Sequence, residues 1–180
     1  MEDLLIRKYH PDDKEEVIDL WFECDLVTPQ NNPKRDIETK LSVNPEWFLV
    51  GIMDGNVVAT CMAGYEGHRG WINYLAVSPQ HRRQGIATLM MAQAESRLRT
   101  AGCPKINLQV REANTEVIQF YESIGYAKEL VVSMGKRLVH DERYCVEPIK
   151  AADADKPRRW STALESTKRK NQGDRSWIER

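Results

Sequence analysis

The chain has 180 residues, a formal net charge of −1, 41% hydrophobic residues and 29% charged residues. This length allows one domain of ordinary size plus an appendage, and the apolar content suffices for a buried core. No apolar run is long enough to span a bilayer, and the near-balanced charge argues against a basic nucleic-acid-binding body, so neither a membrane nor a nucleic acid is an expected partner. The first residues lack the basic and apolar regions of a signal peptide, and we therefore expect a cytoplasmic protein.

The cysteines indicate neither a metal centre nor a disulfide framework. Cys24, Cys61, Cys103 and Cys145 are widely spaced, with no C-x-x-C motif and no histidine pair beside them. Because zinc sites and disulfide scaffolds need clustered cysteines, we expect no bound metal and reduced thiols.

The first third of the chain predicts one strand and two helices. A strand is expected at 4–9, and the Pro11-Asp12-Asp13 run that follows is typical of a helix start, where proline is tolerated and acids meet the positive end of the helix. A polar loop at 25–33 then leads to a short helix at about 34–42. The buried face of the first helix is expected to consist of Val17, Ile18, Trp21 and Cys24.

A hairpin and a third strand are expected next. Strands at 47–53 and 56–62 flank Asp54-Gly55, a dipeptide suited to the positive φ angles of a type I′ turn. A third strand at 71–77 continues the antiparallel meander. It should end at Ser78-Pro79, because proline lacks the amide hydrogen that a central strand needs.

The junction after this third strand has the features of an anion site. Residues 82–87 read Arg-Arg-Gln-Gly-Ile-Ala and open a long helix, whose first N–H groups are unpaired and carry partial positive charge. The segment matches neither the G-x-G-x-x-G nor the G-x-x-x-x-G-K-[ST] phosphate loop. A solvated strand–turn–helix junction is the alternative. The helix is expected to end at Gly102 and to bury Ile86, Leu89, Met90, Ala94, Leu98 and Ala101.

The remaining pattern predicts a strand, a helix and a final strand. These are expected at 105–110, 114–124 and 126–138, and a right-handed crossover should make the first of them parallel to the strand at 71–77. Beyond Tyr144 the pattern dissolves into a charged extension, 145–180, which we expect to be flexible or partly helical. A basic, tryptophan-bearing arm that contacts a partner or nucleic acid is the alternative for this extension.

Two motifs resemble the GNAT N-acetyltransferase family. The loop at 82–87, after a Leu-Ala-Val-Ser-Pro strand end, is similar to the family's acetyl-CoA pyrophosphate loop, Gln/Arg-x-x-Gly-x-Gly/Ala. Downstream, Asn114 and the Phe-Tyr-Glu-Ser-Ile-Gly-Tyr run at 120–126 resemble the family's Asn…Phe-Tyr-x-x-x-Gly-Phe/Tyr segment. Through the segments 64–70, 102–105 and 135–138, the chain most resembles the bacterial YpeA-type subfamily.

The resemblance implies the GNAT fold, an α/β fold with a mixed central sheet, helices on both faces and a V-shaped splay between the strands at 71–77 and 105–110. It implies a GNAT acetyltransferase domain at 1–144 and says nothing about 145–180. In this family the first two helices and their loop usually contact the acceptor, although here they are equally well explained as a solvated connection.

The resemblance also implies acetyl-CoA as cosubstrate. Backbone amides of 83–88 would cradle its pyrophosphate, and the free edge of 75–77 would pair with the pantetheine arm and offer an N–H to the oxyanion. The implied acetyl-CoA-binding residues are Leu75, Ala76, Val77, Arg82, Arg83, Gln84, Gly85, Ile86, Ala87, Thr88, Asn114 and Tyr121.

Tyr121 is the implied general acid, since a phenol with a pKa near 10 is matched to protonating a departing thiolate. A ring packed in the core is the alternative, and Asn114 is equally suited to cap its helix. The general base stays open. Gln109 stands where the ribosomal-protein N-acetyltransferase branch has a catalytic glutamate, and Tyr74 stands where the family often has an acid. The candidates are Glu66, His68, Glu112 or a water chain.

We therefore expect an acetyl-CoA-dependent N-acetyltransferase that acts on a primary amine of a small molecule or amino acid. A protein lysine or N-terminal acetyltransferase is one alternative, and a non-catalytic acyl-CoA-binding or interaction module is another. The acceptor, the oligomeric state (a homodimer included) and the role of 145–180 are not fixed by the sequence.

Overall fold

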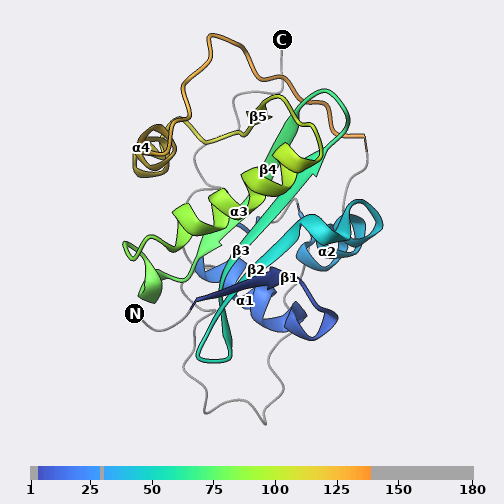
Figure 1. Cartoon of the computed structure of the whole chain (residues 1–180), viewed down its shortest axis with the longest axis vertical. Coiled ribbons are helices and arrows are strands. Elements are labelled where there is room, and N and C mark those ends of the chain that lie inside the picture. Colours follow the sequence, from blue (N-terminus) through green and yellow to red (C-terminus); the bar gives the residue numbers. More distant parts are fainter. Residues whose placement is uncertain (1–3, 29–30, 139–180) are drawn as a thin grey trace, which may run out of the picture. The chain divides into compact units, whose positions relative to one another are not determined.

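The computed structural model describes residues 4–28 and 31–138, and the expected extension at 145–180 lies outside these residues. Short 3-10 turns at Pro11–Asp13, Pro45–Trp47 and Pro79–His81 precede α1, β2 and the loop before α3. The helices and strands, shown in Figure 1, are β1 (Leu5–Lys8), α1 (Lys14–Glu23), α2 (Pro33–Ser42), β2 (Phe48–Met53), β3 (Asn56–Tyr65), β4 (Gly70–Val77), α3 (Ile86–Thr100), β5 (Ile106–Asn107) and α4 (Thr115–Ser123).

The sheet is mixed, as expected. Its strand order is β1-β2-β3-β4-β5, with antiparallel pairs except for the parallel pair β4–β5. The hairpin turn between β2 and β3 has φ angles of 51° at Asp54 and 79° at Gly55, the positive values that a type I′ turn requires. The dipeptide therefore predicted its turn correctly.

The splay between β4 and β5 comes from a very short pairing. Gly70 pairs with Ile106 and Trp71 with Asn107, and the register given for these two strands ends there. Strand β5 is two residues long rather than the six expected at 105–110. The part of β4 beyond Trp71 thus has an edge that β5 does not cover.

Helices cover both faces of the sheet. Alternate residues of a strand point to opposite faces, so β3 contributes side chains to both cores. Ala59, Cys61 and Ala63 of β3 pack in one core with α3 and Tyr121. Met62, the intervening residue, packs in a second core with α1 and α2. Figure 1 shows α3 lying along β3 and β4.

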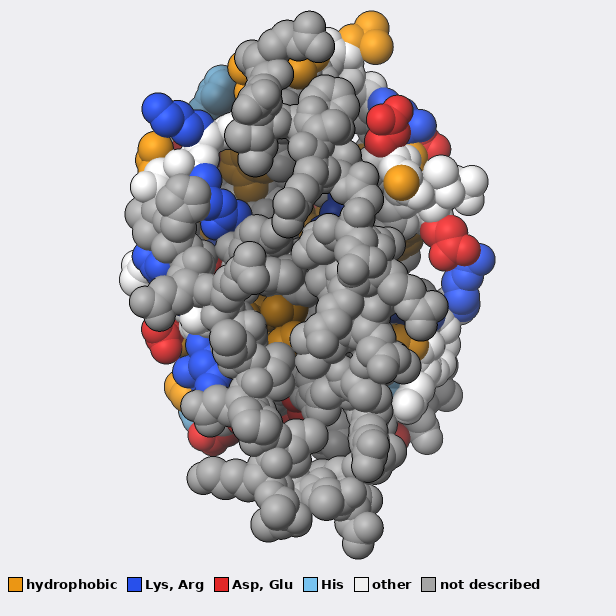
Figure 2. All heavy atoms as spheres, turned by 180° about the vertical axis from the view of Figure 1, so that it is seen from behind, with side chains coloured by type: hydrophobic (Ala, Val, Ile, Leu, Met, Phe, Trp, Pro, Cys, Tyr) orange, Lys and Arg blue, Asp and Glu red, His pale blue; other side chains and the backbone are white. Residues whose placement is uncertain are grey.

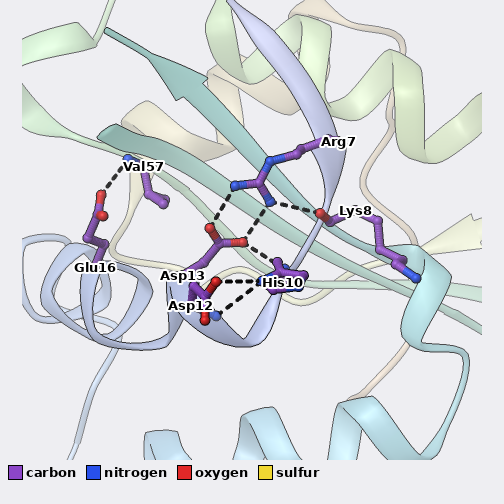
Figure 3. Close-up of polar contacts among 7 residues, drawn as sticks. All are labelled: Arg7, Lys8, His10, Asp12, Asp13, Glu16 and Val57. Carbon is purple, nitrogen blue, oxygen red and sulfur yellow. Dashed lines mark hydrogen bonds and ion pairs between the residues drawn. The ribbon is translucent and has the colours of Figure 1, made fainter. Parts of the chain in front are cut away.

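The start of α1 is fastened to β1 and β3 by ion pairs and hydrogen bonds (Figure 3). Arg7 donates from both terminal nitrogens to the Asp13 carboxylate, each at 2.7 Å, and the His10 N–H donates to the same carboxylate at 2.7 Å. Glu16 accepts from the Val57 N–H at 2.7 Å. These contacts hold the N-terminal strand and helix against the sheet.

Two residues that were expected on the buried face of α3 are exposed. Leu89 is 51% exposed and Ala101 is exposed at the helix end, whereas Met91 is buried. At 100° per residue the buried face is centred between Met90 and Met91, which turns Leu89 toward solvent. On α1, Leu20 is buried while Cys24 caps the helix and is only half-buried.

The final strand expected at 126–138 is absent from the described residues. Leu130, Val132 and Met134 are exposed instead. The segment contacts the β5 region through side chains, with Lys105 paired to Glu129 and Gln109 donating to Ser133 at 2.5 Å. Its apolar, β-branched composition indicated a strand, but β5 is too short to supply a backbone ladder for it.

Candidate active site

The loop before α3 presents unpaired backbone N–H groups. Arg83 and Gly85 have φ angles of 64° and 79°, and left-handed residues so close together turn successive amides toward one concavity. Gly85 is the N-cap of the fifteen-residue α3 and makes no side-chain cap hydrogen bond. The first amides of α3, from Ile86 to Thr88, are therefore free of a side-chain cap, as an anion-binding helix end requires.

Arginine side chains add positive charge to this loop. Arg82 and Arg83 are both exposed. Arg82 folds back over the end of β4, where its Nε donates to the Val77 carbonyl at 3.3 Å and its Nη2 lies 3.7 Å from the Cys24 sulfur. The loop and the strand end are thus joined through one guanidinium.

The free edge of β4 can be read from its hydrogen bonds to β3. Ser78 donates its N–H to the Val58 carbonyl at 2.8 Å, so the neighbouring pair Ala59–Val77 is a non-hydrogen-bonded pair. The N–H and C=O of Val77 consequently point away from β3, toward the splay. An extended ligand chain could pair with them there.

A bulge interrupts β4 next to this edge. Ala76 lies opposite Thr60 and Asn73 opposite Met62, so Tyr74 and Leu75 together face the single residue between them on β3. The Tyr74 carbonyl accepts from the Thr60 hydroxyl at 2.9 Å. Because C=O and N–H point in opposite directions across a planar trans peptide, the Leu75 N–H faces away from Thr60.

Tyr121 lies in the same core as Leu75 and Val77. It is 8% exposed, its ring contacts those of Phe120 and Tyr126 at centroid distances of 5.1 Å and 5.6 Å, and its hydroxyl has no hydrogen-bond partner among the described residues. Burial raises the pKa of the Tyr121 phenol, with a smaller electrostatic contribution from Cys61. The phenol therefore keeps its proton at neutral pH.

Tyr121 also lines an open groove of about 1520 Å³ between α3, the β5 region and α4. Glu95 and Glu112 line the same groove, as does Ile118 one turn before Tyr121. Glu95 accepts from the Tyr126 hydroxyl at 3.1 Å, and burial, followed by the charge of Glu95, raises the pKa of that phenol. Of the three expected base candidates, Glu112 is the one that shares this groove with Tyr121.

Glu66 and His68 lie elsewhere, on the turn between β3 and β4. Glu66 accepts from the Arg69 N–H at 2.9 Å, and this backbone hydrogen bond lowers the pKa of its carboxyl. It therefore has a structural role in closing the turn. Asn114 likewise caps α4, accepting from the Val117 N–H at 3.4 Å, as the sequence allowed.

The partners of Tyr74 were not predicted from the sequence. Its hydroxyl donates to Asp36 of α2 at 2.5 Å and accepts from Asn31 at 2.7 Å. A carboxylate thus comes to the tip of Tyr74 from a helix about forty positions away in the chain. No short motif could reveal this pairing, since it depends on how the loop before α2 folds over the sheet.

The described residues contain no group of three or more His, Cys, Asp or Glu side chains that could hold a metal ion, and none of their helices is long and apolar enough to cross a membrane. On the face seen in Figure 2, the basic and acidic side chains that can be placed are interspersed along the margins.

A family model decides the identity. The model described as the acetyltransferase (GNAT) family matches residues 10–126. The chain belongs to the GNAT acetyltransferase family. It is 46% identical over 139 residues to an acetyltransferase of Yersinia pestis (strain Pestoides F), and 48% identical over 140 residues to one of Sodalis glossinidius (strain morsitans). Each match covers 77% of this chain and 99% of the relative.

Solved structures share this GNAT fold. Ard1 from Thermoplasma volcanium is 26% identical, with a TM-score of 0.63 over 69% of this chain and 82% of that one. AAC(6')-Iy, solved with the bisubstrate analog CoA-S-monomethyl-acetylneamine, is 18% identical, with a TM-score of 0.63 over 75% of this chain and 99% of that one. This GNAT protein is an N-acetyltransferase, and acetyl-CoA is its cosubstrate. The resemblance to the YpeA-type subfamily stays a prediction.

Proposed function

We propose that this GNAT enzyme transfers the acetyl group of acetyl-CoA directly to a primary amine of a small molecule or amino acid, with Tyr121 as the general acid. The observation that supports this best is the Tyr121 hydroxyl. It has no partner among the described residues, and Tyr121 lines the groove between α3, the β5 region and α4 and belongs to the same core as Leu75 and Val77 of the strand edge that would hold the thioester. A tyrosine placed only for packing would have its hydroxyl bonded locally.

Donor binding rests on backbone groups. The amides of 83–88 would take the pyrophosphate, with Arg82 and Arg83 attracting its charge. The edge at Leu75–Val77 would pair with the pantetheine arm, for which Arg82 and the Cys24 thiol must both release the Val77 carbonyl. Ile86 and Ala87 take part through their main chains, and the Asn114 cap sets the orientation of α4 and hence of Tyr121.

The reaction needs one bond formed and one broken. The amine lone pair attacks the thioester carbonyl carbon, and the resulting oxyanion is stabilised by the Leu75 N–H. Collapse of this intermediate breaks the C–S bond, and the thiolate takes the proton of the Tyr121 hydroxyl. The new amide nitrogen loses its extra proton to a base, and solvent returns a proton to Tyr121, giving the acetylated amine and CoA.

Glu112 or a water chain is the proposed base. Glu112 follows the β5 region and lines the groove that Tyr121 lines, whereas Glu66 is engaged in its turn. A carboxylate in the groove would also attract a cationic acceptor, which must give up one proton before it attacks.

The change of Tyr121 to phenylalanine tests the proposal. We expect about a 100-fold or greater loss of kcat, the range of a general acid, with unchanged affinity for acetyl-CoA. Turnover is measured as CoA thiol release against a panel of small amines, amino acids and lysine peptides, and affinity by calorimetry.

Tyr65→Phe is the matched control, because the Tyr65 hydroxyl is bound to the Gly67 and Gly102 carbonyls, away from the groove. Unchanged turnover in Tyr121→Phe would remove this residue from the mechanism. Acetylation of peptides alone would favour the protein acetyltransferase, and binding without transfer to any amine would favour the non-catalytic module.

A further inference from the structure

Tyr74 is held in a conformation that bulky residues rarely adopt. Its φ angle is 51°, inside the left-handed region, although it lies within strand β4. The side chain of an aromatic residue clashes with its own backbone there, so the surrounding structure must enforce the conformation. Such strain is often kept at functional sites, and here it lies one residue before the Leu75 amide.

Four contacts hold Tyr74 in place. The hydroxyl lies between Asp36 and Asn31, the Trp21 ring stacks on the tyrosine ring at 4.0 Å, and the Thr60 hydroxyl binds the carbonyl. The same Thr60 oxygen accepts from Trp21 Nε1 at 2.9 Å. Ring, hydroxyl and backbone are thus fixed by side chains from α1, the loop before α2, α2 and β3.

The hydroxyl partners are themselves positioned. Asn31 Oδ1 accepts from the Thr28 N–H at 2.6 Å and from the Thr28 hydroxyl at 2.7 Å, which leaves the Asn31 amide nitrogen to donate to Tyr74 and, at 3.3 Å, to Asp36. The phenol therefore has one donor and one acceptor in fixed positions. Burial, together with the hydrogen bond and charge of Asp36, raises the pKa of Tyr74, which keeps it a donor.

We infer that this cluster, Asn31, Asp36 and Tyr74, is a positioning clamp that sets the orientation of the Tyr74–Leu75 peptide and so aims the Leu75 N–H at the thioester oxygen. The inference rests on the proposed function, since it assigns the Leu75 amide to the oxyanion. A planar peptide transmits the tilt directly: when the Tyr74 carbonyl is fixed toward Thr60, the Leu75 N–H is fixed in the opposite direction. Without the hydroxyl contacts, the Trp21 ring and the Thr60 hydrogen bond alone oppose relaxation of the strained φ angle, and the amide is expected to tilt away from the thioester oxygen.

Tyr74→Phe is the primary test, because it removes the hydroxyl and keeps the ring that stacks on Trp21. We expect kcat to fall about tenfold, a part of the ~100-fold or more that the loss of a whole oxyanion donor costs, with the KM for acetyl-CoA unchanged within about twofold. We also expect the infrared carbonyl band of bound, carbonyl-labelled acetyl-CoA to move back toward its frequency in solution. A polarised carbonyl absorbs at lower frequency, so this band reports the Leu75 hydrogen bond without any acceptor present.

Asp36→Ala and Asn31→Ala remove the partners of the Tyr74 hydroxyl and keep the tyrosine. They replace Tyr74→Phe as the test if that variant fails to fold. Asp36→Asn retains an acceptor oxygen and is expected to recover most of the kcat lost in Asp36→Ala. Tyr65→Phe, which removes two hydrogen bonds from a tyrosine outside the clamp, is expected to leave kcat and the carbonyl band unchanged.

The outcomes separate the two proposals. Wild-type enzyme that fails to bind acetyl-CoA, or binds it and transfers to no amine, overturns the proposed function. Wild-type enzyme that transfers acetyl groups, together with clamp variants whose kcat and carbonyl band equal those of the wild type, overturns the clamp. A rise in KM for acetyl-CoA with an unchanged band also overturns it, because the hydroxyl would then serve binding alone.

Discussion

Several single residues at this site have unusual backbone conformations. Gly85 begins α3 with a φ of 79°, and an added Cβ would meet nothing within 4 Å. Glycine is therefore required there by the angle and not by lack of space. Gly64 of β3 also has open space around its Cα but has no positive φ, so the angle does not require glycine at that position.

Gly85→Ala is accordingly expected to lower stability by about 1–2 kcal/mol, the cost of a left-handed conformation for a residue with a Cβ. This cost favours a relaxed loop whose amides no longer converge, and we therefore expect acetyl-CoA affinity to fall about tenfold. Chemical denaturation and calorimetry measure the two effects. Gly64→Ala is the control, and a Gly85→Ala variant with unchanged affinity would contradict the role of the loop.

At the scale of elements, the sequence predicted what depends on local chemistry. The hairpin at Asp54-Gly55, the stop at Pro79 and the start of α3 after Gly85 each follow from a φ angle or a missing N–H. The prediction of a final strand was wrong because a strand needs a neighbour with which it can form backbone hydrogen bonds, and β5 ends at Asn107. The partners of Tyr74 were missed for the same reason, since only the tertiary fold brings Asp36 to the Tyr74 hydroxyl.

The junction of β1 and α1 gives a prediction at this scale (Figure 3). Asp13→Asn removes the charge that accepts from both Arg7 nitrogens and the His10 N–H, so we expect a loss of about 1–3 kcal/mol at pH 7, measured by chemical denaturation. Asp12→Asn is the control, because the Asp12 side chain is 90% exposed and contacts only the His10 ring.

The pH dependence of this difference has a defined sign. Burial alone would raise the pKa of Asp13, but the Arg7 hydrogen bonds and the His10 N–H lower it overall. The ion pair therefore contributes its full stability above the unfolded pKa of about 3.9 and loses it as the pH falls through the lower folded pKa. The gap between wild type and Asp13→Asn should close in that acidic range, and a gap that stays constant would contradict the assignment.

At the scale of the whole molecule, the two faces of the sheet divide the work. The face under α3 and α4 holds Tyr121 with Leu75 and Val77, and the face under α1 and α2 holds Tyr74 of the proposed clamp. Strand β4 contributes to both faces, so the proposed clamp on one face can orient an amide that is proposed to act on the other. Motifs predicted the loop and helix end of the first face, and periodicity predicted the buried Val17, Ile18 and Trp21 of the second, but neither predicted the partners of Tyr74, which depend on packing.

Three phenols on these faces, those of Tyr74, Tyr121 and Tyr126, link the stability of the fold to alkaline pH. Burial raises the pKa of each, so the folded state holds these protons more tightly than the unfolded chain, whose tyrosines titrate near a pKa of about 10. Their contribution is fully present below that pH and is lost as the pH rises toward the folded pKa values.

We therefore expect the phenolate absorbance of these three tyrosines to rise only as circular dichroism reports unfolding. Tyr126→Phe removes one of the phenols that ionise on unfolding, so the free energy of unfolding of this variant should depend less steeply on pH above about 10. Tyr65→Phe removes a tyrosine outside this set and should leave the coupling between absorbance and unfolding unchanged. Phenolate absorbance from all three tyrosines near pH 10 with the fold preserved would contradict the burial of these groups, and with it the protonated state assumed for Tyr121.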